Sequence, residues 1–504
     1  KTYLELEGCL SVDIDLTQIR VSFDEPTRVR IGARSRHDRP AATVTTTPEP
    51  GDLMRAISTF GSALKTMSPE RSYPTLRGHP PEIELGDEWS LPESVDPPDS
   101  NLQLVVPPEY ESIFAVAPLA YYLGATLEQG ESPKLVSDTG FEYDFRSSRG
   151  YETEIAETLK QVFFLDCLTR TEGLYNYDLH ERRALEPKLD LDFTTLYDRP
   201  LPQQLEAYLS VPHTVIEEYI PEWRLTAHVE PDPSSVTLLP FVVDDLAVIC
   251  SSLQTKASVG GNGPARPSLA QASDGVLTRS ADTIDGQTRS TDGTSRESDS
   301  AYVQPVADGT LEQAWIGDEI PIGASKLVES AFRNRLDRDL AEGSIRITIV
   351  VNDARMAEER DLVNSAYGER DELPFDVELH TDTTVAELRD ILTQRSEFLH
   401  YIGHTEFDGF ECSDGKLDAA TLEDTGVDSF LLNACNSYNQ GIQLIEAGAI
   451  GGIVTLTDII NEGAVRIGES IARLLNAGFP LRASLTIARN QSVQGGQYIV
   501  VGDG

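Results

Sequence analysis

The chain has 504 residues, of which 83 are acidic and 41 basic, and its formal net charge is −42. This charge excludes a general nucleic-acid-binding protein, because a phosphate backbone requires a basic surface. Together with a content of only eight lysines, it is typical of a cytoplasmic protein adapted to molar salt, where screening falls to about 3 Å and carboxylates repel one another little.

The cysteines and the apolar runs argue against further classes of protein. The five cysteines are odd in number, widely spaced and without a C-x-x-C pair, which argues against a disulfide framework and the common zinc sites; they are Cys9, Cys167, Cys250, Cys412 and Cys435. No apolar run reaches the roughly 18 residues that a membrane span needs, and no signal peptide is recognisable. We therefore expect a reduced, cytoplasmic protein with no membrane span, metal or cofactor.

The first 250 residues are predicted to form two regions. Residues 1–108 contain short alternating runs typical of half-exposed strands, one helical pattern over 53–67, and a proline-rich passage that ends the region. Residues 109–250 are predicted to be a mixed α/β region with a strong helix over 151–170. Neither region carries a motif from which a function follows.

Residues 251–303 differ in composition from the rest of the chain. Ser, Thr, Gly, Asp and Arg dominate, and apolar residues occur singly. Such a segment buries too little surface to offset the entropy lost on ordering, so the sequence predicts a disordered linker.

Residues 304–504 are predicted to form one α/β domain with its core in 344–504. After a helix over 326–341, a β-branched run at 345–351 indicates a strand buried on both faces. Strands and helices then alternate; the predicted strands are near 375–379, 398–404, 430–435, 450–456 and 498–501, and the helices near 362–367, 384–392, 439–448, 465–475 and 481–490. Such alternation predicts a mainly parallel sheet with right-handed crossovers.

Two of these strands deliver chemically active side chains to their carboxyl ends. The run Phe398–Ile402 leads to Gly403 and His404, and the run from Phe430 leads through Asn433 to Cys435. In open α/β sheets, sites lie beyond the carboxyl ends of the strands. A histidine beside a cysteine supplies the general base that a thiol nucleophile needs. The alternative to a catalytic pair is that Cys435 is a buried structural cysteine and His404 a turn residue.

The oxyanion that forms during acyl transfer would need backbone N–H donors. We expect them in the turns after Gly403, at Thr405 and at Cys435. Two rivals for the catalytic pair remain: Cys412 lies in a turn-like stretch close to His404, and His400 shares one strand face with His404. We expect His400 to lie in the core.

Residues 344–504 resemble a CHAT domain, the caspase-like peptidase module of the caspase–separase clan. The motifs behind the resemblance are Leu399-His400-Tyr401-Ile402-Gly403-His404, Leu431-Leu432-Asn433-Ala434-Cys435-Asn436-Ser437, Glu446-Ala447-Gly448-Ala449 and Tyr498-Ile499-Val500-Val501-Gly502-Asp503. The resemblance implies a caspase-like α/β sandwich, a dyad of His404 and Cys435, and cleavage of peptide bonds under control of a sensor region. It places the substrate pocket near Asp458. Thr405 stands where the family usually has glycine.

The first hypothesis is therefore a cysteine endopeptidase that acts on proteins or peptides and is regulated, with or without a partner, through its N-terminal region. A second is a catalytically inactive, CHAT-derived interaction module. A third is a doubly wound domain that binds a small molecule. Rapid alkylation of Cys435 would distinguish the first from the others, because an active thiol reacts fast at neutral pH.

Overall fold

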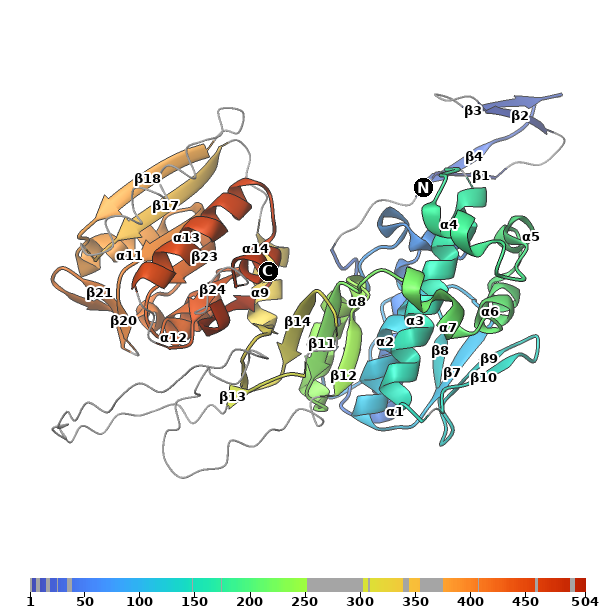
Figure 1. The fold of residues 1–504 in the computed structure, drawn as a ribbon, viewed down its shortest axis with the longest axis horizontal. Helices are drawn as coiled ribbons and strands as arrows, with labels where there is room; N and C mark the ends of the chain where they lie inside the picture. The colour runs from blue at the N-terminus through green and yellow to red at the C-terminus, as the bar shows by residue number, and fades with distance from the viewer. Residues whose placement is uncertain are drawn as a thin grey trace, which may run out of the picture. The chain divides into compact units, whose positions relative to one another are not determined.

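A computed structural model of the chain describes residues 2–5, 10–14, 19–24, 26–33, 39–146, 148–173, 175–251, 302–306, 309–338, 344–353, 375–406, 408–457, 461–489 and 495–504 (Figure 1). The chain divides into two compact units. The first comprises Lys1–Trp223 and Asp232–Ile249, and the second comprises Arg224–Pro231 and Cys250–Gly504. Most of the predicted linker at 251–303 and the predicted helix near 362–367 lie outside the described residues.

The first unit is built around a pair of long helices and a four-stranded sheet. Helices α2 (Tyr110–Leu123) and α3 (Tyr151–Thr169) pack against each other. The sheet has the order β10-β9-β7-β8, and its strands are β7 (Leu102–Val106), β8 (Thr126–Gln129), β9 (Lys134–Ser137) and β10 (Glu142–Asp144). Strand β7 pairs in parallel with β8, so one sheet spans the boundary predicted after residue 108. The prolines there interrupt the chain without separating two folding units.

Shorter elements complete the first unit. The strands form the pairs β1 (Thr2–Glu5) with β4 (Arg30–Ala33), β2 (Leu10–Ile14) with β3 (Ile19–Phe23), and β5 (Thr43–Thr46) with β6 (Glu82–Leu85). The helices are α1 (Pro50–Ser58), α4 (His180–Leu185), α5 (Phe193–Tyr197), α6 (Leu201–Leu209), α7 (His213–Ile216) and α8 (Leu239–Asp244). Helix α1 is shorter than the predicted helix over 53–67, because the chain continues as a 3₁₀ turn over Phe60–Ala63.

The large sheet has the order β12-β11-β14-β16-β25-β24-β23-β19-β17-β18, and its strands belong to the second unit except that the unit boundary after Ile249 falls within β12. Its strands are β11 (Leu225–Val229), β12 (Val248–Ser251), β14 (Glu312–Ile316), β16 (Ser325–Lys326), β17 (Ile345–Val351), β18 (Phe375–Thr381), β19 (Ser396–Ile402), β23 (Val427–Asn433), β24 (Gly451–Thr455) and β25 (Tyr498–Gly502). Strands β24 and β25 pair antiparallel. The other neighbouring strands from β11 to β18 in this order pair in parallel. The prediction of an α/β fold with a mainly parallel sheet is confirmed.

Helices cover both faces of this sheet, as Figure 1 shows for α13 in front of β23. The helices are α9 (Glu329–Asp337), α11 (Val385–Thr393), α12 (Tyr438–Glu446), α13 (Asn461–Asn476) and α14 (Leu481–Arg489). One apolar core joins the sheet to α11 and α12, and a second joins it to α13 and α14. A capping box begins α11: the Thr384 hydroxyl accepts from the Glu387 N–H, and the Glu387 carboxylate accepts from the Thr384 N–H at 2.9 Å.

Strand β11 comes from the region predicted to end at residue 250, yet it belongs to the second unit. All five of its residues are buried, and it pairs in parallel with β14. A strand buried on both faces needs ladder partners for its backbone groups, and β14 provides them. The chain therefore enters the second unit once at residues 224–231 before it returns after residue 249.

Short two-stranded and three-stranded ladders accompany the large sheet. Strands β13 (Tyr302–Val303) and β15 (Ile320–Pro321) pair in parallel. Strands β20 (Thr405–Glu406), β21 (Gly409–Cys412) and β22 (Gly415–Leu417) form an antiparallel ladder directly after β19. This second ladder fixes the path of the chain after His404.

The packing between β23 and β24 gives the first testable prediction. A methyl group on Gly452 would lie 2.1 Å from Cδ2 of the buried Phe430 ring, whereas a methyl group on Gly415 would make only an ordinary 3.5 Å contact. We expect Gly452→Ala to destabilise the second unit by about 1–3 kcal/mol, the usual cost of overpacking. Thermal denaturation followed by circular dichroism measures this effect, with Gly415→Ala as the control. Equal melting temperatures for the two variants would contradict the packing.

Candidate active site

The register of three neighbouring strands aligns the candidate catalytic residues. Strand β19 lies between β17 and β23 and pairs with both in parallel. Ile402 is paired with Val351 on one side and with Asn433 on the other. His404 and Cys435 each lie two residues beyond these paired positions, and so does Asp353 after β17. Because neighbouring strands are about 4.8 Å apart, the three residues form a row at one edge of the sheet.

A close ion-pair contact joins two members of this row. Nε2 of His404 lies 2.8 Å from Oδ2 of Asp353. The Asp353 side chain is 5% exposed, and the His404 side chain is 30% exposed. A buried carboxylate at this distance is placed to orient the imidazole ring. The ring is thus oriented on one side while it stays accessible on the other.

Asn352 holds the turn that carries Asp353. Its backbone N–H donates to the carbonyl of Ile402 at 2.8 Å, and its side-chain amide donates to the carbonyl of Glu411 at 3.0 Å. Its Oδ1 accepts from both the N–H and the hydroxyl of Thr383. Asn352 therefore ties the end of β17 to the end of β19, to β21 and to the turn after β18.

The turn after β19 is fixed by Tyr401, which is fully buried. Its hydroxyl lies 3.1 Å from the carbonyl of His404 and 3.0 Å from that of Glu411. A Cβ atom on Gly403 would lie 2.9 Å from the Tyr401 hydroxyl. Gly403 is therefore needed for close packing beneath the histidine, whatever part its N–H plays in binding an oxyanion.

Thr405 links the histidine turn to the cysteine turn. Its buried hydroxyl donates to the carbonyl oxygen of Cys435. A glycine at this position would lack that hydroxyl. Thr405 therefore adds a direct hydrogen bond between the two turns that carry His404 and Cys435.

The cysteine turn is anchored on β24. Thr455 donates through its hydroxyl to the carbonyl of Ala434. Its backbone N–H donates to the Ser437 hydroxyl at 2.9 Å, and the Ser437 hydroxyl lies 3.2 Å from the carbonyl of Leu432. Asn436 has a left-handed backbone (φ 52°), a conformation that asparagine tolerates well. Cys435 is half-buried at the start of this turn, so its thiol is held on a well-fixed backbone.

The other sequence candidates lie elsewhere. His400 is fully buried in the middle of β19, opposite Ile349 and Leu431, as expected for a core residue. Cys412 ends β21 and packs against the core cluster that includes Phe410 and Leu417. Asp458 lies outside the described residues.

Asp353 is the residue that sequence reasoning missed. The prediction of a strand over 345–351 is confirmed, and Asn352-Asp353 directly follows it, just as Gly403-His404 follows the strand ending at Ile402. The available signal was the same strand-end rule that identified His404 and Cys435. The rule points to Asp353 as a partner of His404 only when β17 is known to lie beside β19, and the sequence alone does not show that order.

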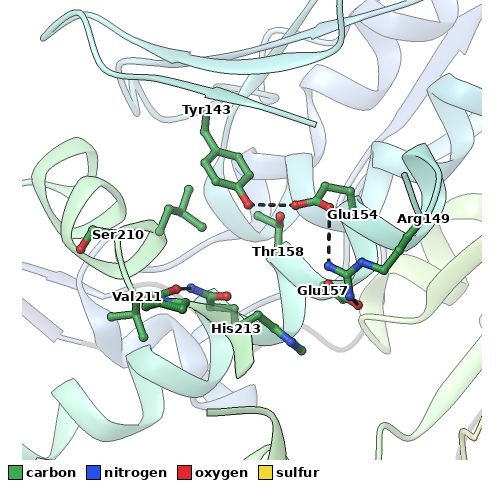
Figure 2. A pocket seen from close by; sticks show the side chains of 11 residues that line it. Tyr143, Arg149, Glu154, Glu157, Thr158, Ser210, Val211 and His213 are labelled. Atoms are coloured by element: carbon green, nitrogen blue, oxygen red, sulfur yellow. Dashed lines mark hydrogen bonds and ion pairs between the residues drawn. The ribbon is translucent and has the colours of Figure 1, made fainter. Parts of the chain in front are cut away.

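The described residues contain neither a metal cluster nor a membrane-spanning helix. No group of three or more His, Cys, Asp or Glu side chains there is arranged to hold a metal ion, and no described helix has both the length and the apolarity to cross a bilayer. The first unit has a hollow of about 250 Å³ at the start of α3. Figure 2 shows that Glu154 there accepts from the Tyr143 hydroxyl and faces Arg149. The Arg149 guanidinium in this hollow is therefore paired with the carboxylates of Glu154 and Glu157.

Comparison with solved structures finds partial, distant similarity. Part of the chain is similar to the Saccharomyces cerevisiae separase–securin complex, with 10% identity, a TM-score of 0.28, and coverage of 39% of this chain and 16% of that chain. It is also similar to the Arg-specific cysteine proteinase gingipain R (10% identity, TM-score 0.30, 39% and 63% coverage). It is similar as well to the complex of the Porphyromonas gingivalis RgpB pro- and mature domains, with 9% identity, a TM-score of 0.29, and coverage of 36% of this chain and 55% of that chain. The chain spans less than two thirds of each of these chains.

Comparison of the sequence with family models and with curated proteins finds no match.

The burial of Cys412 gives a prediction that separates it from Cys435. Burial raises the pKa of the Cys412 thiol to about 11, and the nearby Asp414 carboxylate adds to the shift. At pH 8 about one molecule in a thousand then carries this thiolate, which is the reactive form. We expect alkylation of Cys412 by iodoacetamide, mapped by mass spectrometry, to rise about tenfold per pH unit between pH 8 and 10. The Cys412→Ala variant identifies the peptide, and a labelling rate independent of pH would contradict the assignment.

Proposed function

We propose that the chain is a cysteine endopeptidase of the caspase-like type. The observation that carries the proposal is the in-register row of Asp353, His404 and Cys435 at the carboxyl ends of three adjacent parallel strands. A nucleophile, a base and a group that orients the base are the parts that covalent acyl transfer requires. The link from the Thr405 hydroxyl to the Cys435 carbonyl adds support, because it ties the two turns together.

In the proposed reaction, His404 takes the proton of the Cys435 thiol while Sγ attacks the carbonyl carbon of the scissile peptide bond. A C–S bond forms, and the carbonyl oxygen becomes an oxyanion that accepts from backbone N–H groups after Gly403 and at Cys435. The protonated His404 then gives its proton to the leaving amine, and the C–N bond breaks. Water, deprotonated by His404, attacks the thioester, which releases the acid and regenerates the thiol.

Asp353 acts through His404. With Nε2 of the imidazole held by the carboxylate, Nδ1 is the nitrogen suited to exchange a proton with the thiol. The negative charge of Asp353 stabilises the imidazolium that forms when the thiolate is generated. Asp353 is therefore a positioning residue rather than one that reacts.

The substrate and the control of the enzyme are part of the same proposal. The substrate is a protein or peptide, bound near Asp458, and the enzyme works in the cytoplasm. The N-terminal region, with or without a partner protein, regulates it. Support for regulation comes from β11, which joins the sheet of the catalytic strands while the chain on either side of it belongs to the first unit.

Replacing Asp353 tests the positioning role. We expect Asp353→Asn to lower kcat roughly 10²–10⁴-fold with a smaller effect on KM, because the amide can neither orient nor stabilise the imidazolium as the carboxylate does. Cleavage of a peptide library in molar salt measures the effect. Asp382→Asn removes the same charge at an exposed position with a left-handed backbone and should keep wild-type activity. Equal rates for Asp353→Asn and wild type would contradict the role.

Replacing the pair itself tests the catalytic assignment. We expect Cys435→Ala and His404→Ala to abolish cleavage with near-native melting curves, whereas Cys412→Ala keeps activity. His400→Ala should lower the melting temperature, because it leaves a cavity in the middle of β19. Full activity of Cys435→Ala would show that the nucleophile is wrong. A wild-type protein that alkylates rapidly at Cys435 but cleaves no peptide would favour the inactive interaction module.

A further inference from the structure

A hollow in the second unit lies between helix α14 and the start of strand β14. Its volume is about 260 Å³, and its polar lining includes Glu312, Gln313, Ser325, Arg482, Thr486 and Arg489; we call it the Arg482 pocket. In the sheet order, β16, β25 and β24 separate β14 from β23, the strand that leads to Cys435. The Arg482 pocket is therefore distinct from the candidate catalytic row.

Arg482 is a buried cation whose hydrogen bonds are incomplete. Its side chain is 7% exposed, and its Nη2 lies 3.7 Å from Oδ1 of Asp503. The other oxygen of Asp503 lies 2.7 Å from Arg335, so that carboxylate is shared. Within the described part of the chain, Nε and Nη1 of Arg482 are buried and meet no acceptor. A buried charged donor without an acceptor is costly, so an acceptor brought by a ligand would bind favourably.

A group of opposite sign lines the same pocket. Oε2 of Glu312 is buried and meets no donor among the described residues. Arg489, at the far end of the same helix face as Arg482, donates to the main-chain oxygens of Tyr498 and Gly323. The pocket thus offers unmet donors and an unmet acceptor, and its charged lining residues sum to +1 in a chain of net charge −42.

We propose that the Arg482 pocket binds a small zwitterionic ligand of the α-amino-acid class. Its carboxylate accepts from Arg482, and its ammonium group donates to Glu312. A simple anion would face the Glu312 carboxylate without satisfying it, and a simple cation would face two guanidinium groups. The volume is slightly below the roughly 300–1,000 Å³ typical of drug-sized ligands, which suits a molecule of amino-acid size. This site would serve as an effector site, and it does not depend on the peptidase proposal.

Binding of single amino acids to the full chain tests the inference. The probes are glycine, L-aspartate and L-glutamate, with acetate and methylammonium as half-ligands, and binding is followed by ligand-detected NMR and by the melting temperature. We expect saturable binding of at least one amino acid, about tenfold or more tighter than acetate, because a charge-assisted hydrogen bond is worth about a factor of ten. Cys435→Ala should bind equally well, so that loss of peptidase activity and loss of this site are distinguishable.

Two variants separate the roles of the pocket residues. Glu312→Gln should weaken amino-acid binding about tenfold and leave acetate binding unchanged or stronger. Arg482→Gln should abolish binding of both; if that variant does not fold, the contrast between amino acid and acetate in Glu312→Gln still decides. Failure of every amino acid to bind the wild-type chain would overturn the inference. So would equal binding of amino acid and acetate, or amino-acid binding unaffected by Glu312→Gln.

Discussion

The parallel register of β17, β19 and β23 is the constraint on which the candidate site depends. It places Asp353, His404 and Cys435 at equivalent positions, each two residues beyond a paired strand end. A slip of one residue in any strand would turn its side chains to the other face of the sheet. The hydrophobic residues buried on both faces of the sheet prevent such a slip, because each strand has apolar neighbours above and below. The core thus fixes the geometry at the sheet edge.

The turns that follow β17, β19 and β23 are held mainly by neutral hydrogen bonds and not by exposed ion pairs. Neutral hydrogen bonds from Asn352, Tyr401, Thr405, Thr455 and Ser437 fix the three turns. The contact between Asp353 and His404 is largely buried. Salt screens buried pairs much less than exposed ones. The geometry of a site built in this way depends little on the salt concentration.

The sequence allowed much of the second unit to be predicted, because its buried strands and amphipathic helices have different periods. The strand at 345–351 and the helix near 384–392 are examples. The contribution of β11 could not be predicted, because a short apolar run does not reveal which sheet it joins. Asp353 was missed for a similar reason: its role depends on β17 being the neighbour of β19, and strand order is a tertiary property. The Arg482 pocket likewise joins residues about 170 positions apart in the sequence.

We propose that His404 activates Cys435 at the carboxyl ends of β19 and β23. The most direct test is the rate of Cys435 alkylation by iodoacetamide as a function of pH, measured for the wild type and His404→Ala in molar salt. This measurement requires no knowledge of the substrate. We expect rapid labelling of the wild type at neutral pH and a profile displaced to higher pH in His404→Ala, since the thiolate is the reactive form. Superimposable profiles would contradict it.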